Sequence, residues 1–146
     1  LTLEHNGEPM KVVSDPRRLR QILLNLLSNA IKFGKGQPIR VHSQPGEDGG
    51  IVIEVMDQGE GIAPTDQEKI FDEFVQLGKT QLTEGTGLGL PISRRLAEML
   101  HGGLDVESEL GKGSIFRLRL PDSAEGPALR ATKQTEVAAD VEHAVR

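Results

Sequence analysis

The segment from Arg17 to Phe33 is the strongest regular pattern in this sequence. Asp15 followed by Pro16 is typical of a helix start, because proline is well tolerated at the first helical position. Gly34 is a typical helix end. Between them, apolar residues recur every three or four positions and form one helix face: Leu19, Ile22, Leu23, Leu26, Leu27, Ala30 and Ile31. A long helix with a single apolar face must pack on a second layer, which here has to come from the strands.

Four segments with alternating apolar residues predict those strands, and a fifth, short one precedes the helix. In chain order they are Met10–Val13, Pro38–Ser43, Ile51–Met56, Leu104–Ser108 and Ser114–Leu120. Further helices are expected at Pro64–Phe74 and Gly87–Leu100. We therefore predict an α/β (α+β) fold, a two-layer sandwich in which helices Asp15–Phe33 and Gly87–Leu100 cover one face of a mixed β-sheet. The core is expected to include Leu19, Leu23, Leu26, Ile92 and Leu96.

Charge and composition exclude several classes of protein. The net charge of −5 argues against a general nucleic-acid binder. No apolar run is long enough to span a bilayer, and no signal peptide is visible. The chain has no cysteine, which excludes disulfides and thiolate metal sites and fits a reducing compartment. Its 146 residues suit one domain.

The sequence Glu84–Leu90 contains three alternating glycines, Gly85, Gly87 and Gly89, directly before the second long helix. Glycines allow close approach of the backbone, and the free N–H groups at a helix start attract anions. The pattern therefore favours a phosphate-binding loop. On its own it fits equally well a flexible loop that opens a helix.

Polar residues elsewhere add to this pattern. Asn25, Asn29 and Lys32 share one side of the first helix, away from its leucines. Asp57 ends a predicted strand and is followed by Gly59 and Gly61. Taken alone, each asparagine also fits a solvated helix face, and Asp57 also fits an ordinary turn at a strand end.

The order of these motifs, together with Phe71–Phe74 and Gly111–Ser114, strongly resembles the ATP-binding catalytic domain of sensor histidine kinases. This is the Bergerat fold shared with DNA gyrase, MutL and the heat-shock 90 chaperones. The phrase from Arg18 to Phe33 is similar to the family's N box almost letter for letter. The resemblance implies a lead-in from an upstream domain at 1–10, the catalytic domain at 11–120, and a tail or linker at 121–146, which its composition predicts to be disordered.

The resemblance also implies roles for individual residues. Asn25 and Asn29 would be Mg²⁺ ligands, and with Lys32, which would contact phosphate, they would be the catalytic residues. Asp57 would accept a hydrogen bond from the adenine amino group. The other residues expected to bind ATP are Gly59, Gly61, Ile62, Phe74, Gln76, Gly85, Thr86, Gly87, Leu88, Gly89, Leu90 and Ser114. The segment Val75–Glu84 would be the ATP lid, although Glu84 replaces a glycine that many relatives have.

Two observations favour phosphoryl transfer over ATP hydrolysis. Asn25 stands where the gyrase branch has a water-activating glutamate, and an amide is no general base. The four histidines, His5, His42, His101 and His143, all lack the sequence context of a phospho-acceptor. The implied cofactors are ATP and Mg²⁺, and the implied partners are an upstream phospho-acceptor helical hairpin and a response-regulator receiver domain. The parent kinase is expected to be a cytoplasmic or membrane-anchored homodimer, with no contact of this chain with membrane or nucleic acid.

Two alternatives remain open at this point. An anti-sigma-factor-type serine kinase has the same fold, and acid-stable phosphate on serine would favour it. A non-catalytic nucleotide-binding module is the other, and the complete set of motifs argues against it.

Overall fold

The computed structural model describes residues 3–6, 10, 12–75, 77 and 87–122. Its sheet has the strand order β1-β2-β3-β5-β4. β1 and β2 are parallel and all other neighbours are antiparallel, so the sheet is mixed as predicted. The elements are β1 (Leu3–Asn6), α1 (Pro16–Phe33), β2 (Ile39–Pro45), β3 (Ile51–Asp57), the 3₁₀ turn η1 (Lys69–Phe71), α2 (Gly89–Met99), β4 (Gly103–Glu109) and β5 (Gly113–Leu120).

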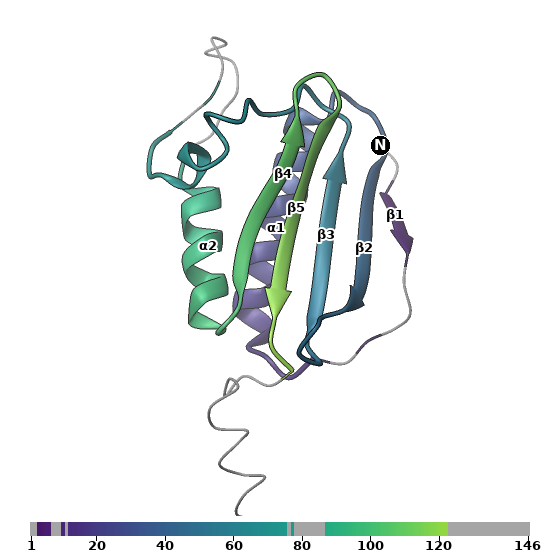
Figure 1. Cartoon of the computed structure of the whole chain (residues 1–146), viewed down its shortest axis with the longest axis vertical. Helices are drawn as coiled ribbons and strands as arrows, with labels where there is room; N and C mark the ends of the chain where they lie inside the picture. Colours follow the sequence, from purple (N-terminus) through teal and green to yellow (C-terminus); the bar gives the residue numbers. More distant parts are fainter. Residues whose placement is uncertain (1–2, 7–9, 11, 76, 78–86, 123–146) are drawn as a thin grey trace, which may run out of the picture.

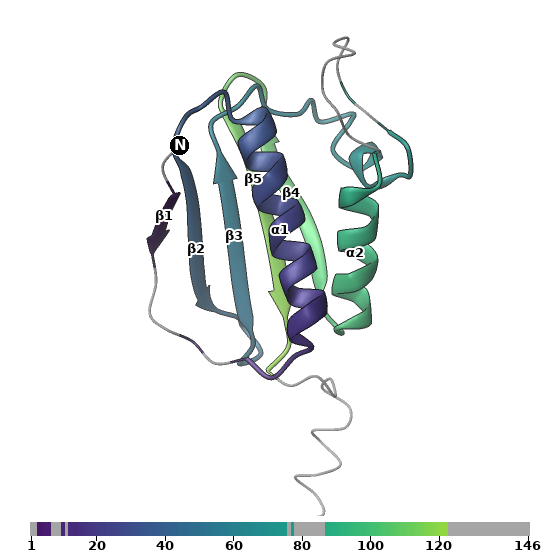
Figure 2. The same cartoon turned by 180° about the vertical axis from the view of Figure 1, so that it is seen from behind.

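Both α-helices lie on the same face of the sheet, as Figures 1 and 2 show from opposite sides. The predicted two-layer sandwich is therefore confirmed. The core lies between the layers and consists of Ile22, Leu26, Ala30, Ile39, Ile51, Val55, Ile70, Phe71, Ala97, Leu100, Leu104, Phe116, Leu118 and Leu120. Neither of the described α-helices combines the length and the hydropathy that a membrane crossing requires.

Helix α1 begins and ends where its sequence predicts. The Asp15 side chain accepts hydrogen bonds from the backbone N–H groups of Arg17 (2.9 Å) and Arg18 (3.4 Å). These are two of the donors that a helix start leaves without intrahelical partners. At the other end, the Gly34 N–H bonds to the Ala30 carbonyl across 2.9 Å. The caps fix the register of α1, and with it the direction of its polar side.

The predicted core is partly correct. Leu26 is fully buried, and Leu19, Leu23 and Leu96 are half-buried against the core. Ile92 was wrongly placed there, because it is 43 % exposed while its neighbour Ser93 is completely buried. The face of α2 that packs inward has small residues at Ser93 and Ala97, which let α2 lie close to α1. On α1, Ile31 is also exposed rather than part of the buried face.

Two element predictions were wrong. The predicted helix Pro64–Phe74 is reduced to the turn η1, and the backbone at Phe74 has a φ of +63°, which ends any right-handed helix. Met10, Val12 and Val13 form no strand; the extra strand is β1, inside the expected lead-in. It exists through parallel pairing with β2, which a local pattern does not reveal. The tail beyond residue 122 lies outside the described residues.

The sheet face away from the helices carries a network of paired charges. Arg117 of β5 bonds to Glu54 of β3 and to Glu107 of β4, each across 2.6 Å. Arg119 and Asp105 form a further pair on this face. Paired charges suit a water-facing surface, whereas the buried apolar residues of β3, β4 and β5 are directed to the helices.

Candidate functional site

Asp57 is the last residue of β3 and one of few buried charged groups in the described structure, at 9 % exposure. Its carboxylate accepts hydrogen bonds from the backbone N–H groups of Gly59 (Oδ1, 2.8 Å) and Ser114. Burial raises the pKa of Asp57, and these two N–H groups partly oppose that rise. The side chain lies under the end of α1, because a Cβ on Gly34 would be 3.6 Å from the Asp57 Cβ.

The turn after Asp57 packs too closely for side chains. A Cβ at Gly59 would lie 2.1 Å from the Phe33 carbonyl oxygen. Gly61 has a φ of +73°, and a Cβ there would lie 2.1 Å from the Glu109 carbonyl oxygen. Both glycines predicted as site residues are therefore required by the backbone path, which fixes the loop beside Asp57.

A hydroxyl network connects this loop to the β4–β5 hairpin. The Ser108 Oγ accepts a hydrogen bond from the Ile62 N–H and donates one to the Gly113 carbonyl, both across 2.8 Å. It also lies 2.9 Å from the Ser114 Oγ. Gln67 adds a bond from its Nε2 to the Ser108 carbonyl across 2.9 Å. Neither Ser108 nor Gln67 was predicted from the sequence, because no local pattern shows that Ser108 pairs with Ser114 on β5 or that Gln67 bonds to the Ser108 carbonyl.

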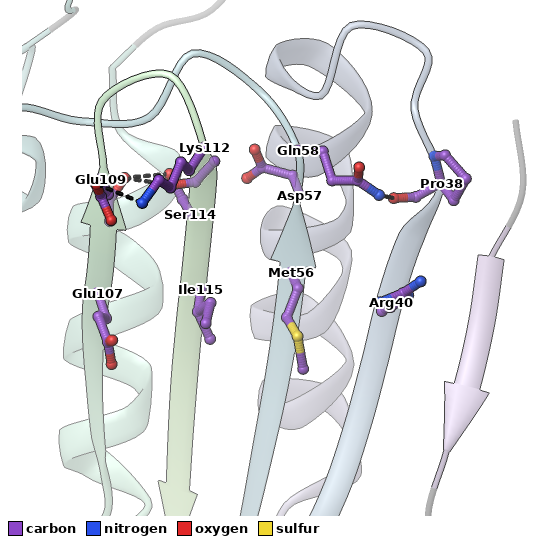
Figure 3. A pocket seen from close by; sticks show the side chains of 12 residues that line it. Pro38, Arg40, Met56, Asp57, Gln58, Glu107, Glu109, Lys112, Ser114 and Ile115 are labelled. Atoms are coloured by element: carbon purple, nitrogen blue, oxygen red, sulfur yellow. Dashed lines mark hydrogen bonds and ion pairs between the residues drawn. The ribbon is translucent and has the colours of Figure 1, made fainter.

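A hollow of about 540 Å³ lies at the same end of the sheet. Figure 3 shows Met56, Ile115 and Glu107 on its side of the sheet, with the helices behind the sheet. Of the residues predicted from sequence, its lining includes only Asp57 and Ser114. The remaining predicted residues that the structure describes belong to the helices and the loops around them.

The start of α2 leaves backbone donors available. Its N-cap, Leu88, makes no side-chain capping bond. Gly89 and Leu90 follow within the first turn, where N–H groups have no intrahelical acceptor, and Pro91 has no N–H. Gly87 precedes them with a φ of +69°. This arrangement of N–H groups without intrahelical acceptors, at the positive end of a helix dipole, is suited to an anion.

The polar side of α1 connects this helix start with Asp57. Asn25 donates hydrogen bonds from Nδ2 to the Gly89 carbonyl (3.2 Å) and to the Ser93 Oγ (2.9 Å). Asn29 and Lys32 follow on the stretch of α1 between this contact and the end of the helix beside Asp57. Asn29 is half-buried, and Lys32 is exposed with its Nζ 5.4 Å from the centre of the Phe33 ring.

The remaining predicted residues fall into three groups. Ile62 and Leu90 pack partly against the core. In a nucleotide site they would contribute their backbone groups or the exposed part of their side chains. Phe74, expected among the ATP-binding residues, is 72 % exposed, while Phe71 is buried under the Arg94 guanidinium at 4.1 Å. Gln76, Gly85 and Thr86 lie outside the described residues. In the part of the chain that the structure describes, no three histidine, aspartate or glutamate side chains gather as a metal site.

Comparison with known proteins gives a consistent result. Residues 14–124 match the family model described as histidine kinase-, DNA gyrase B-, and HSP90-like ATPase. The adaptive-response sensory kinase SasA of Synechococcus sp. (strain JA-2-3B'a(2-13)) is 44 % identical over 108 residues, which are 73 % of this chain and 29 % of SasA. The chain thus spans less than a third of that relative.

Solved structures agree with the family match. Full-length ShkA in complex with AMPPNP has a TM-score of 0.73 and 34 % identity, over 84 % of this chain and 25 % of ShkA. The mycobacterial sensor histidine kinase MprB has a TM-score of 0.73 and 27 % identity, over 84 % of this chain and 82 % of the MprB chain.

Proposed function

Because the chain belongs to the family of histidine kinase-, DNA gyrase B- and HSP90-like ATPases, and is homologous to the catalytic domains of sensor histidine kinases, we propose that it binds ATP and donates the γ-phosphoryl group to a histidine of a separate domain. The nucleotide would lie on the helix-covered side of the sheet. Its base would contact Asp57, and its phosphates would contact the start of α2.

The buried carboxylate of Asp57 carries this proposal. A carboxylate only accepts hydrogen bonds, so it favours a base with an exocyclic amino group over one with a carbonyl in that place. The Gly59 and Ser114 N–H groups help to keep it ionised despite burial. The turn through Gly59 and Gly61 leaves backbone, without side chains, beside it. These features fit adenine better than guanine.

The donor set also fits a magnesium–triphosphate. Mg²⁺ prefers oxygen ligands and retains several waters, so it needs few protein ligands when phosphates supply the rest. Without a carboxylate cluster among the described residues, the amide oxygens of Asn25 and Asn29 are the candidate ligands, and we assign Asn29 because the Asn25 Oδ1 accepts a hydrogen bond from Gln21. Lys32 would contact the phosphates, as would the N–H groups of Gly87, Leu88 and Gly89. When bound, Mg²⁺ would neutralise phosphate charge.

The residues of this chain would contribute orientation and charge to the reaction. Asn25 has no basic group with which to activate water, which favours transfer over hydrolysis. The acceptor would be a histidine on a helical hairpin of the parent kinase, and a response-regulator receiver domain would receive the phosphoryl group next. Such a parent would act as a homodimer, and this chain would work in the cytoplasm, where ATP is available.

The test combines binding and transfer. Calorimetry should show Mg²⁺-dependent binding of a non-hydrolysable ATP analogue, and radiolabel from ATP should appear on the parent's hairpin added in trans. Asn29→Ala should abolish transfer and leave thermal unfolding unchanged within error, since Asn29 is not part of the core. Serine-bound, acid-stable label on this chain without the hairpin would support the serine-kinase alternative, and absence of nucleotide binding would refute the proposal.

A further inference from the structure

The nitrogen and the oxygen of the Asn25 side-chain amide form hydrogen bonds with different helices. Its Nδ2 contacts the Gly89 carbonyl and the Ser93 hydroxyl of α2. Its Oδ1 accepts a hydrogen bond from the Gln21 Nε2 across 3.2 Å. Gln21 lies one turn before Asn25 on α1, whereas Asn29 lies one turn after it. The oxygen of Asn25 therefore points along α1 away from Asn29.

This orientation of the amide follows from hydrogen-bond chemistry. The Gly89 carbonyl can only accept a hydrogen bond, so the atom facing it must be the NH₂ group. Turning the amide over would place two oxygens against each other. The contact with α2 thus uses the nitrogen of Asn25 and directs its oxygen to Gln21, whereas a metal ligand has to present that oxygen.

The two groups that Asn25 contacts, the Gly89 carbonyl and the Ser93 hydroxyl, lie near the start of α2. These contacts therefore help to set the position of that helix start. Ser93 is completely buried, and its hydroxyl needs a partner inside the interface between the helices. Gly89 is the first residue of α2, and a Cβ there would lie 3.9 Å from the Asn25 Cγ. One side chain of α1 therefore holds both the first residue of α2 and a residue one turn further on.

We propose that Asn25 is a positioning residue: its NH₂ group holds the start of α2 against α1, so that the free N–H groups there face the side of α1 that carries Asn29 and Lys32. The inference rests on the proposed function, because those N–H groups matter through the phosphates they bind. It assigns the two asparagines of the N box different tasks, one to the position of α2 and one to the metal.

Matched alanine variants one helix turn apart separate these tasks. We would measure the affinity for ADP by calorimetry, once with Mg²⁺ and once with EDTA, for wild type, Asn25→Ala and Asn29→Ala. A positioning residue supports phosphate binding whether or not metal is present. Asn25→Ala should therefore weaken ADP binding about three- to tenfold in both conditions, as expected for the loss of hydrogen bonds. Asn29→Ala should weaken it only with Mg²⁺.

Ser93→Ala supplies the second test, because it removes one of the two contacts of the Asn25 NH₂ group with α2, keeps the contact with the Gly89 carbonyl, and leaves the Asn25 oxygen untouched. It should reproduce a two- to fivefold loss in both conditions, and the double variant with Asn25→Ala should lose less than the product of the single losses. Ser28→Ala, on the exposed surface of α1, should bind like wild type. Thermal unfolding of each variant verifies that it is folded.

The outcomes separate this inference from the proposed function. If Asn25→Ala weakens binding only with Mg²⁺, or if the losses of Asn25→Ala and Ser93→Ala multiply in full in the double variant, the positioning role is wrong while nucleotide binding stands. If wild type binds no nucleotide in either condition, both the proposed function and this inference are refuted.

Discussion

The backbone N–H of Phe74 donates a hydrogen bond to the carbonyl oxygen of Gly87 across 3.1 Å. The two residues lie thirteen positions apart, and both have a positive φ, +63° and +69°. The bond joins the segment after η1 to the segment before α2. The backbone conformations of Phe74 and Gly87 therefore help to fix the position of the start of α2.

Gly87→Ala should therefore be costly. The new Cβ would lie 2.9 Å from the Phe74 Cα, and alanine is disfavoured at this positive φ. We expect a loss of about 1–2 kcal/mol in the free energy of unfolding, measured by urea denaturation, together with weaker nucleotide binding. Gly103→Ala is the control, because a Cβ there meets nothing within 4 Å. Equal stability of the two variants would contradict the expectation.

Asp57→Asn should weaken ATP binding by an order of magnitude or more. The carboxylate accepts a charge-assisted hydrogen bond from the adenine amino group in our proposal, and such a bond is worth about 1.5–3 kcal/mol. Calorimetry on the variant, with GTP as a comparison nucleotide, measures the loss directly. Wild-type affinity for ATP in Asp57→Asn would show that the base contacts another residue.

The same residue should give a specific pH dependence of stability. Burial raises the pKa of Asp57 in the folded protein, so the folded state binds its proton more tightly than the unfolded state. The stability this contributes is present below the ordinary aspartate pKa of about 3.9 and is lost as pH rises through the raised folded value. Asp57→Asn, which cannot ionise, should thus gain stability relative to wild type as pH rises, which chemical denaturation between pH 4 and 7 would detect. A pH-independent difference would contradict the raised pKa.

Ser108→Ala should damage the site without removing any group that contacts nucleotide in our proposal. The variant leaves the Ile62 N–H without its acceptor and removes a partner of Ser114. We expect a loss of about 1–3 kcal/mol in unfolding free energy and a several-fold weaker affinity for ATP. Ser28→Ala serves again as the exposed control. Unchanged affinity would mean that the hydroxyl network does not order the loop beside Asp57.

Much of the fold was predictable because its signals are local. The apolar spacing and caps of α1, and the alternation in β2, β3, β4 and β5, follow from the geometry of each element alone. The Pro64–Phe74 segment forms turns and the short 3₁₀ turn η1 instead of a helix, and the extended backbone at Asp72 with the positive φ at Phe74 ends it. β1 was missed because a strand of four residues is held by its pairing with β2 rather than by its own pattern.

The sequence by itself determined which chemistry is present: amides and a lysine on one side of a helix, a carboxylate after a strand, and a glycine-rich helix start. Residue types and their spacing are properties of the amino-acid sequence alone. Tertiary structure alone decided which partner each group has. Asn25 and Ser93 are 68 positions apart, and Ser108 approaches Ile62 across 46 positions. Hydrogen bonds depend on atoms within about 3 Å, and only the packing of α2 on α1 and the register of β4 with β5 bring these atoms to that distance.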